Sequence, residues 1–262
     1  MDLSVIIVNY KSIDKTRQCL AALNMADFTG ISHEIIVVDN ASGDNVDALK
    51  IYFPRVRIIK SPANSGMGEG NNLGIRNSFG DFLLILNPDT YLEKEAIQIM
   101  FRYMKNYPRA GIVGPKLLNP DGSLQNSCLR FPKLYTPILR RTSLGKFFKK
   151  HLDDFIMADF NHAEARVVDW MMGSALMVKR AMLEKIGPAF DKRFFMFFED
   201  TDLCRRAKEA GYQAVYLPEA LGTHDHSRAS AQGRWYIAIF TNQLARAHIA
   251  SWFKYFWKWR DL

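Results

Sequence analysis

Short apolar runs alternate with amphipathic stretches along the first half of the chain. The apolar runs have the length of buried strands, and the stretches between them repeat their apolar positions every three to four residues. This alternation is typical of βα units arranged around a parallel sheet. It predicts strands at residues 4–9, 34–39, 56–60 and 82–86, and clear helices at residues 14–25 and 93–107.

The second half is less regular. A turn at residues 119–122 precedes a basic, proline-containing region without a clear period, which we interpret as a variable insertion. Regular patterns return at residues 167–178, and they predict a helix that begins at residue 179 and stops before 187, a helix at 203–210 and a strand at 214–217. With 262 residues, 48% of them hydrophobic, the chain can bury one large core. We expect one α/β domain over residues 1–242, with the insertion at 131–165, and an amphipathic C-terminal helix over 243–262.

Polar side chains stand at the carboxyl end of each of the first four strands. They are Asn9, Asp39, Asn64 and the pair Asn87 and Asp89. Because ligands of parallel sheets bind beyond the carboxyl ends of the strands, we expect these side chains to line one crevice. Carboxylate and amide oxygens suit Mg²⁺, which needs only one or two protein ligands when phosphates supply the others. The same residues also suit an ordinary turn that caps the next helix.

Glycine-rich and acidic segments add two further candidates. No glycine-rich dinucleotide motif follows the first strand, which argues against a dinucleotide cofactor. Glycines do cluster at residues 66–70, where a helix start that needs backbone freedom is the simplest interpretation. An aromatic run at 194–198 ends in the carboxylates Glu199, Asp200 and Asp202, which could complement the N-terminus of a helix.

Seven motifs occur in a fixed order along the chain. They are SVIIVNY at 4–10, VVDNAS at 37–42, NSGMGEGNNLG at 64–74, LNPDT at 86–90, GSALM at 173–177, FEDTDL at 198–203 and His224. Together they resemble a family-two inverting glycosyltransferase of the GT-A fold, a Rossmann-like, mostly parallel sheet flanked by helices. The resemblance is strongest to the rhamnosyltransferase branch and runs from about residue 4 to about residue 242.

The resemblance implies roles for the donor and metal residues. Six residues would bind the nucleotide-sugar donor, namely Asn9, Asp39, Asn64, Gly66, Asn71 and Asn87. Asp89 and His224 would hold Mg²⁺ or Mn²⁺ against the donor diphosphate, with His226 as the less suitable substitute for His224. The metal motif of the family is usually Asp-x-Asp. Because Asn87 replaces its first carboxylate, we assign Asn87 to contacts with the donor or with water.

The resemblance also implies an acceptor side. Asp200 would be the catalytic base that takes the proton of the acceptor hydroxyl, and Glu199 is the second candidate. Gly173 and Ser174 would line the acceptor pocket. Trp170 would either stack on a sugar ring or pack in the core, and the core role is common for a tryptophan beside methionines.

Charge and cysteine content restrict the partners. The net charge of +8 indicates an anionic partner, but no helix-turn-helix, zinc or RNA-recognition signature accompanies it, so we expect no nucleic acid. Cys19, Cys128 and Cys204 are odd in number and widely spaced, which fits a reducing cytoplasm better than a disulfide framework. Neither a secretory signal nor a membrane-spanning run is predicted.

The C-terminal segment interleaves aromatic and basic residues. On a helix, Ile249, Trp252, Phe256 and Trp259 share a face, with Phe253 and Trp257 widening it and Lys254 and Lys258 forming an adjacent basic stripe. This pattern predicts a peripheral anchor on an anionic membrane. In the alternative, the helix packs its aromatics onto the catalytic domain or onto a second subunit.

The resemblance implies one expected function, and the sequence leaves one alternative. The expected function is transfer of a sugar, L-rhamnose from dTDP-L-rhamnose, to a lipid-linked or polysaccharide acceptor at the cytoplasmic face of the cell membrane, in cell-surface glycan synthesis. The alternative is a non-catalytic nucleotide-sugar-binding or scaffold module, which the incomplete metal motif suggests.

Overall fold

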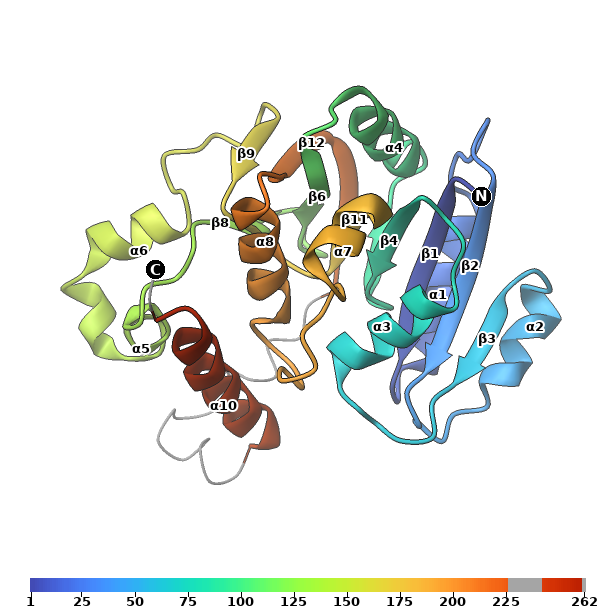
Figure 1. Cartoon of the computed structure of the whole chain (residues 1–262), viewed down its shortest axis with the longest axis horizontal. Helices are drawn as coiled ribbons and strands as arrows, with labels where there is room; N and C mark the ends of the chain where they lie inside the picture. The colour runs from blue at the N-terminus through green and yellow to red at the C-terminus, as the bar shows by residue number, and fades with distance from the viewer. Residues whose placement is uncertain (226–241, 261–262) are drawn as a thin grey trace.

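A ten-stranded sheet forms the centre of the molecule, and helices cover both of its faces (Figure 1). The structure is a computed structural model that describes residues 1–225 and 242–260. The strand order is β3-β2-β1-β4-β11-β6-β12-β5, with β7 paired to β6 and β9 paired to β12. This mixed sheet with flanking helices is the α/β architecture that the sequence predicts.

The first four strands are parallel, and their ends lie within one residue of the predicted ends. They are β1 (Leu3–Asn9), β2 (His33–Asp39), β3 (Arg57–Lys60) and β4 (Phe82–Leu86). All seven residues of β1 are buried, because β1 has neighbours on both edges and helices on both faces. The strand direction reverses at β11 (Ala175–Lys179), which lies between β4 and β6 (Ala110–Leu118) and is antiparallel to both.

Two hydrophobic cores lie on opposite faces of this sheet. Val5 and Ile7 of β1 pack with α1 (Ile13–Asn24) and α4 (Ala96–Asn106), whereas Ile6 points to the face covered by α7 (Arg180–Ile186). Successive residues of a strand point to opposite faces, so one strand contributes to both cores. The predicted helices at 14–25, 93–107 and 179–186 are confirmed.

Helix α3 (Met67–Arg76) covers the same face as α7 and α8 (Glu199–Glu209). Its glycines allow a close approach to the sheet, because a Cβ at Gly74 would lie 2.5 Å from the Ile6 side chain. Short elements complete the first half: a 3-10 turn (Val46–Ala48), α2 (Leu49–Tyr52) and β5 (Thr90–Leu92).

Two boundaries differ from the predicted ones. Helix α8 spans Glu199–Glu209 and so begins four residues before the predicted start, which puts the acidic cluster inside its first turn. Strand β12 spans Gln213–His224 and continues seven residues beyond the predicted end, through a register shift between Leu217 and Leu221. Pairing with β6 and β5 supports this long strand although Pro218 and Gly222 lie within it.

The predicted insertion at 131–165 contains regular structure. It holds α5 (Thr136–Arg141), a 3-10 turn (Ser143–Lys146) and α6 (Lys149–Phe155), which form a lobe at one end of the molecule (Figure 1). Short strands flank it, namely β7 (Leu124–Gln125), β8 (Cys128–Leu129), β9 (Arg166–Val168) and β10 (Trp170–Met171). The helices here are too short to show a period in the sequence.

The C-terminal helix α10 (Gln243–Lys258) packs on the preceding domain, as in the alternative interpretation. The predicted membrane face is wrong for Trp252 and Trp259, because their indole N–H groups donate to Leu134 O at 3.0 Å and to Asp202 Oδ1 at 2.9 Å. Lys258 is not part of an exposed stripe either, since its ammonium group lies 2.6 Å from the buried carboxylate of Asp202. The exposed aromatics of α10 are Phe253 and Trp257.

None of the helices within residues 1–225 and 242–260 is long and apolar enough to cross a membrane. The three cysteines are buried and free.

Candidate functional site

The carboxyl ends of β1, β2 and β4 meet at one edge of the sheet, as the sequence predicts. Asn9 and Asp39 are directly paired in the parallel register, and Ile7 pairs with Leu86, the residue before Asn87. The backbone N–H of Asn87 donates to Ser174 O at 2.9 Å, which joins this edge to the turn before β11. Polar residues from both halves of the chain therefore converge here.

Asn9 is fully buried, and protein groups engage its amide on both sides. Its Nδ2 donates to Ser42 Oγ at 3.1 Å and to Asp44 Oδ2 at 2.9 Å, and its Oδ1 accepts a hydrogen bond of 2.9 Å from Thr16. Ser42 also donates to Asp39 Oδ1 at 2.5 Å. Asn9 thus orients the loop after β2. Because these bonds involve Asp39 Oδ1, the other carboxylate oxygen, Oδ2, is available for a ligand.

Asn40 holds the loop after β3. It lies in the motif at residues 37–42 but is not among the predicted donor residues. Its buried amide donates to Asn64 Oδ1 at 2.9 Å and to Gly66 O at 3.1 Å and accepts from the N–H of Ser65. Asn64 Oδ1 also accepts from the N–H of Gly66 at 3.0 Å. These bonds attach the predicted donor residues Asn64 and Gly66 to Asn40, the residue that follows Asp39.

Gly66 connects this loop to the segment before α8. Its φ of +92° is in the left-handed region, and a Cβ would lie 2.1 Å from the carbonyl oxygen of Phe195. That carbonyl accepts a hydrogen bond from the N–H of Met67 at 3.1 Å. The amide of Asn71 donates to Met67 O at 3.0 Å, so it stabilises the first turn of α3. Only glycine allows the two segments to touch here.

Asp89 and His224 lie side by side, as the sequence predicts. His224 Nε2 is 3.4 Å from Asp89 Oδ1, a buried atom without a hydrogen bond among the described residues. Burial by itself would raise the pKa of Asp89. His224 and Lys15 outweigh this effect, so the pKa of Asp89 is lowered overall. The ammonium group of Lys15 is 3.9 Å from Asp89 Oδ2. A carboxylate that stays ionised beside an imidazole nitrogen suits a divalent cation.

The described part of the chain contains no cluster of three metal-ligating side chains. The pair therefore fits a metal whose other ligands are phosphate oxygens and water, which is common for Mg²⁺. Asp225 is next to this pair, because its N–H donates to Asp89 O at 2.9 Å and its carboxylate lies 3.0 Å from Lys15. His226, the substitute candidate, lies outside the described residues.

Glu199 and Asp200 open α8 after two residues, Phe197 and Phe198, with left-handed φ values of 70° and 66°. Asp200 Oδ2 accepts from the N–H of Gly173 at 2.8 Å, and Oδ1 accepts from the N–H of Thr201 at 2.7 Å. Burial raises the pKa of Asp200, and the two hydrogen bonds only partly offset this increase. Burial and the charge of Asp200 raise the pKa of Glu199 to about 8.

The two carboxyl groups therefore differ in their surroundings. Glu199 Oε2 is buried without a hydrogen-bond partner among the described residues, and the raised pKa favours the protonated form of Glu199. Asp200 accepts backbone hydrogen bonds that favour its carboxylate form. A partly exposed carboxylate beside a neutral carboxylic acid is an arrangement that can accept a proton.

Of the predicted acceptor residues, Gly173 contacts this carboxylate. A Cβ at Gly173 would lie 3.3 Å from Asp200 Cβ, so the absence of a side chain there lets Asp200 reach the backbone. Ser174 is buried, and its Oγ has no partner among the described residues. The indole of Trp170 is half-buried beside the core that contains Ile6, and its ring centroid lies 6.2 Å from that of Phe155. The core role of Trp170 accounts for these contacts.

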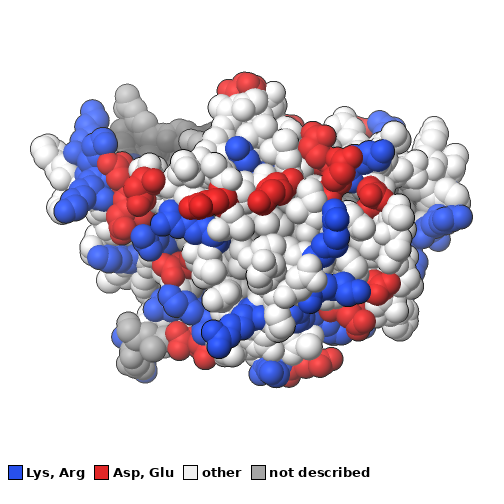
Figure 2. Space-filling view, turned by 90° about the horizontal axis from the view of Figure 1, so that it is seen from above, with Lys and Arg blue, Asp and Glu red and all other residues white. Residues whose placement is uncertain are grey.

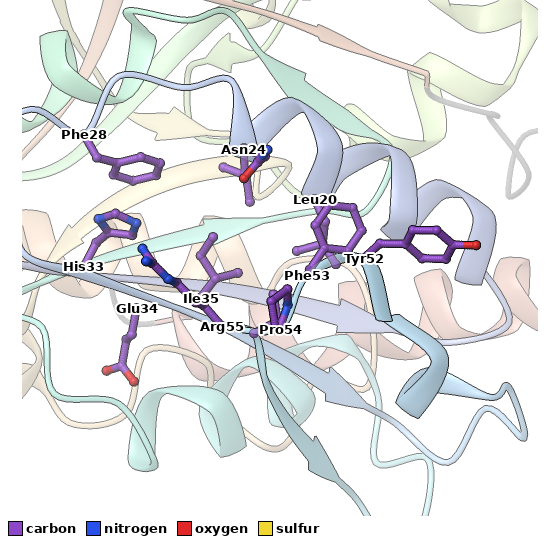
Figure 3. A pocket seen from close by; sticks show the side chains of 12 residues that line it. Leu20, Asn24, Phe28, His33, Glu34, Ile35, Tyr52, Phe53, Pro54 and Arg55 are labelled. Atoms are coloured by element: carbon purple, nitrogen blue, oxygen red, sulfur yellow. The ribbon is translucent and has the colours of Figure 1, made fainter. Parts of the chain in front are cut away.

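A cavity of about 430 Å³ lies elsewhere (Figure 3). Leu20 and Asn24 of α1, the residues from Tyr52 to Val56, and His33 and Glu34 at the start of β2 line it. It is thus at the amino end of β2, whereas Asp39 stands at the carboxyl end. None of the predicted site residues contributes to this cavity.

Acidic and basic side chains are interspersed on the face seen in Figure 2. The excess of eight positive charges is not gathered into a single patch on that face. This distribution does not favour binding of an extended polyanion there.

Comparison with known proteins agrees with the geometry. Residues 4–166 match Glycosyl transferase family 2. The chain is 29% identical to the N-acetylglucosaminyl-diphospho-decaprenol L-rhamnosyltransferase of Mycobacterium tuberculosis over 88% of this chain and 78% of that protein. It is 26% identical to the rhamnosyltransferase WbbL of Escherichia coli over 94% of both chains.

Solved structures share the fold at low identity. S. aureus TarS in complex with UDP-GlcNAc superposes with a TM-score of 0.62 at 17% identity, over 89% of this chain and 61% of that one. The mannosyltransferase PcManGT of Pyrobaculum calidifontis, in complex with GDP-Man and Mn²⁺, gives a TM-score of 0.62 at 17% identity, over 96% of this chain and 64% of that one. The chain spans less than two thirds of these solved chains. From the family match and the fold, the protein belongs to glycosyl transferase family 2, has the GT-A fold and is similar to the rhamnosyltransferases of that family.

Proposed function

We propose that this glycosyltransferase is a metal-dependent inverting rhamnosyltransferase that moves L-rhamnose from dTDP-L-rhamnose to a lipid-linked acceptor. The observation that carries the proposal is that Asp200 and the segment that leads to Asp89 are both hydrogen-bonded to one dipeptide, Gly173–Ser174. Gly173 binds Asp200 through its N–H, and Ser174 binds Asn87, two residues before Asp89, through its carbonyl. The metal candidate and the base candidate are therefore on either side of a short backbone turn.

Asp200 is the proposed base. In an inverting transfer, the acceptor hydroxyl gives its proton to Asp200 while its oxygen attacks the anomeric carbon from the face opposite the nucleotide. The bond from that carbon to the diphosphate breaks at the same time, and the diphosphate leaves with the electron pair. The Gly173 N–H at 2.8 Å holds Asp200 in place, and protonated Glu199 adds no competing charge.

The donor would lie across the strand ends. Asp39 is the proposed contact for the nucleoside, and Asn64 and Gly66 form the adjoining loop. Asn9 acts by positioning, because its amide is engaged by Ser42, Asp44 and Thr16. Asp89 and His224 would hold Mg²⁺ or Mn²⁺, and the metal, when bound, would neutralise the charge of the leaving diphosphate.

Membrane association is proposed through a smaller aromatic surface than the sequence predicts. Phe253 and Trp257 of α10 are 60% and 72% exposed, and Arg260 lies 4.4 Å from the Trp257 ring. Aromatic and cationic groups together suit the headgroup region of an anionic bilayer. The relatives from M. tuberculosis and E. coli are both named as rhamnosyltransferases. The name of the first includes a diphospho-decaprenol acceptor, which supports a lipid-linked acceptor for this protein.

The competing function is a nucleotide-sugar-binding module without turnover, which Asn87 in place of the first metal carboxylate favours. A panel of nucleotide sugars separates the two, with hydrolysis and thermal stabilisation measured with and without Mn²⁺. We expect dTDP-L-rhamnose to give the largest stabilisation and to be turned over only with metal. Asp89→Ala should remove the metal-dependent part, while Asp47→Ala, an exposed carboxylate paired with Lys60, should not. Stabilisation without turnover with any donor or acceptor would favour the binding module.

A further inference from the structure

A chain of side-chain hydrogen bonds runs from the turn at residues 119–122 to His224. Ser123 Oγ donates to Asp121 Oδ1 at 2.6 Å, and Asn119 Nδ2 donates to Ser123 Oγ at 2.9 Å. Gln125 Nε2 donates to Asn119 Oδ1 at 2.9 Å, and Gln125 Oε1 lies 2.7 Å from His224 Nδ1. Four links thus connect a surface carboxylate to a buried imidazole.

The carboxylate sets the direction of every link. Ionised Asp121 can only accept, so the single hydroxyl proton of Ser123 points to it and the Ser123 oxygen is left to accept. Asn119 must then present its NH₂ group to Ser123 and its oxygen to Gln125. Gln125 in turn presents its NH₂ group to Asn119 and its oxygen to His224. The proton of this last bond can come only from His224 Nδ1.

This direction determines the tautomer of His224. A neutral imidazole carries one N–H, so with the proton on Nδ1 the lone pair is on Nε2. Nε2 is the nitrogen that lies 3.4 Å from Asp89 Oδ1, the buried oxygen without a hydrogen bond among the described residues. A metal ion held by both residues would therefore lie between this lone pair and the Asp89 carboxylate.

Gln125 is also held rigidly relative to His224. Strand β7 pairs with β6 at Leu117, and β12 pairs with the same part of β6, where Gly222 is opposite Leu117. Gln125 is 9% exposed and His224 is 2% exposed, so the bond between them is shielded from water. The hairpin that carries Gln125 therefore has a fixed register against the strand that carries His224.

We propose that Gln125 is a positioning residue of the metal site, which fixes His224 in the Nδ1-protonated tautomer and leaves Nε2 for the metal. The proposal rests on the metal use inferred above. Outer partners of metal-bound histidines typically affect metal affinity by about 10 to 100-fold. The turn at 119–122 would then serve the active site although it contacts neither donor nor acceptor.

Mn²⁺ binding in the presence of dTDP tests the role of Gln125. We expect Gln125→Leu to weaken Mn²⁺ binding by about 10 to 100-fold in isothermal titration. Gln125→Glu keeps an oxygen that accepts from Nδ1 and should stay close to the parent. The matched control is Gln98→Leu, a partly buried glutamine on α4 that donates to Thr29 O. Equal Mn²⁺ affinities for the parent and Gln125→Leu would overturn the proposal.

The tautomer can be measured without any change at Gln125. Nitrogen-15 NMR of the histidine-labelled, metal-free protein distinguishes protonated from unprotonated ring nitrogens, and a His224→Gln sample assigns the signal. We expect Nδ1 protonated and Nε2 unprotonated at a pH where the ring is neutral. The opposite tautomer in the parent overturns this inference alone. A parent protein that binds no Mn²⁺ with dTDP overturns the metal proposal as well.

Discussion

The backbone N–H of Gly173 donates a hydrogen bond of 2.8 Å to the carboxylate of Asp200. This bond fixes one oxygen of the proposed base against the turn before β11, and Thr201 N–H fixes the other at 2.7 Å. Glu199, its neighbour in the sequence, makes no comparable bond through Oε2 to any residue that the structure describes. The two adjacent carboxyl groups are therefore not equivalent, although the sequence presents them as alternatives.

Asp200→Asn should lower turnover by about 10² or more, because the acceptor hydroxyl would lose its base. Glu199→Gln should have a smaller effect, since a neutral amide resembles the protonated acid. Steady-state transfer rates with saturating donor measure this, and dTDP affinity serves as the control for an intact donor site. If Glu199→Gln were the more damaging change in equally folded proteins, the roles of the two residues would be reversed.

Glu199→Gln should also change how stability depends on pH. In the parent, the pKa of Glu199 is raised to about 8 by burial and by Asp200, so the folded state holds a proton that the unfolded state has already lost. The free energy of unfolding of the parent should therefore fall as pH rises from the ordinary glutamate range to about 8. The variant lacks this proton and should become more stable relative to the parent over the same window.

Urea unfolding of the metal-free proteins at several pH values gives the measurement. The expected result is a difference between variant and parent that grows from acidic pH up to pH 8 and is constant above it. A difference that does not vary with pH would mean that Glu199 is not protonated in the folded protein.

Lys258→Met should destabilise the protein by about 3 kcal/mol, because it removes a partner of a buried carboxylate. Lys258 lies 2.6 Å from Asp202, which is completely buried, and 2.9 Å from Asp191. Lys208→Met is the matched control, since Lys208 is 60% exposed beside Asp169 and an exposed pair contributes below about 1 kcal/mol. Urea unfolding at neutral pH compares them, and equal losses would contradict a structural role for α10.

Replacing both Phe253 and Trp257 with serine should weaken binding to anionic liposomes by roughly tenfold or more, since burying one large aromatic contributes about 1.5–3 kcal/mol. Ile51 and Phe79 provide the control pair, because they are 77% and 70% exposed in the first half of the chain. Sedimentation at equal salt measures the bound fraction. Equal pelleting of the two double variants would eliminate α10 as the membrane contact.

The sequence by itself determined the sheet that carries the proposed donor site. Apolar runs followed by Asn9, Asp39 and Asn87 predicted both the strands and their common edge, because the carboxyl ends of parallel strands lie at the same edge of a sheet. The ordered motifs added the family, which the match over residues 4–166 confirms. Local hydrophobic period and strand-end chemistry are properties of neighbouring residues, and the sequence displays them directly.

Only the tertiary structure decided what depends on contacts between distant segments. Trp259 and Lys258 have the spacing of a membrane-facing helix, yet they bind Asp202, which lies more than fifty residues earlier. Gln125 follows an ordinary turn in the sequence, and its role appears only where β6 brings it 2.7 Å from His224. Amphipathic periodicity shows that a face is apolar or aromatic, but the packing of the whole chain determines whether that face meets lipid or protein.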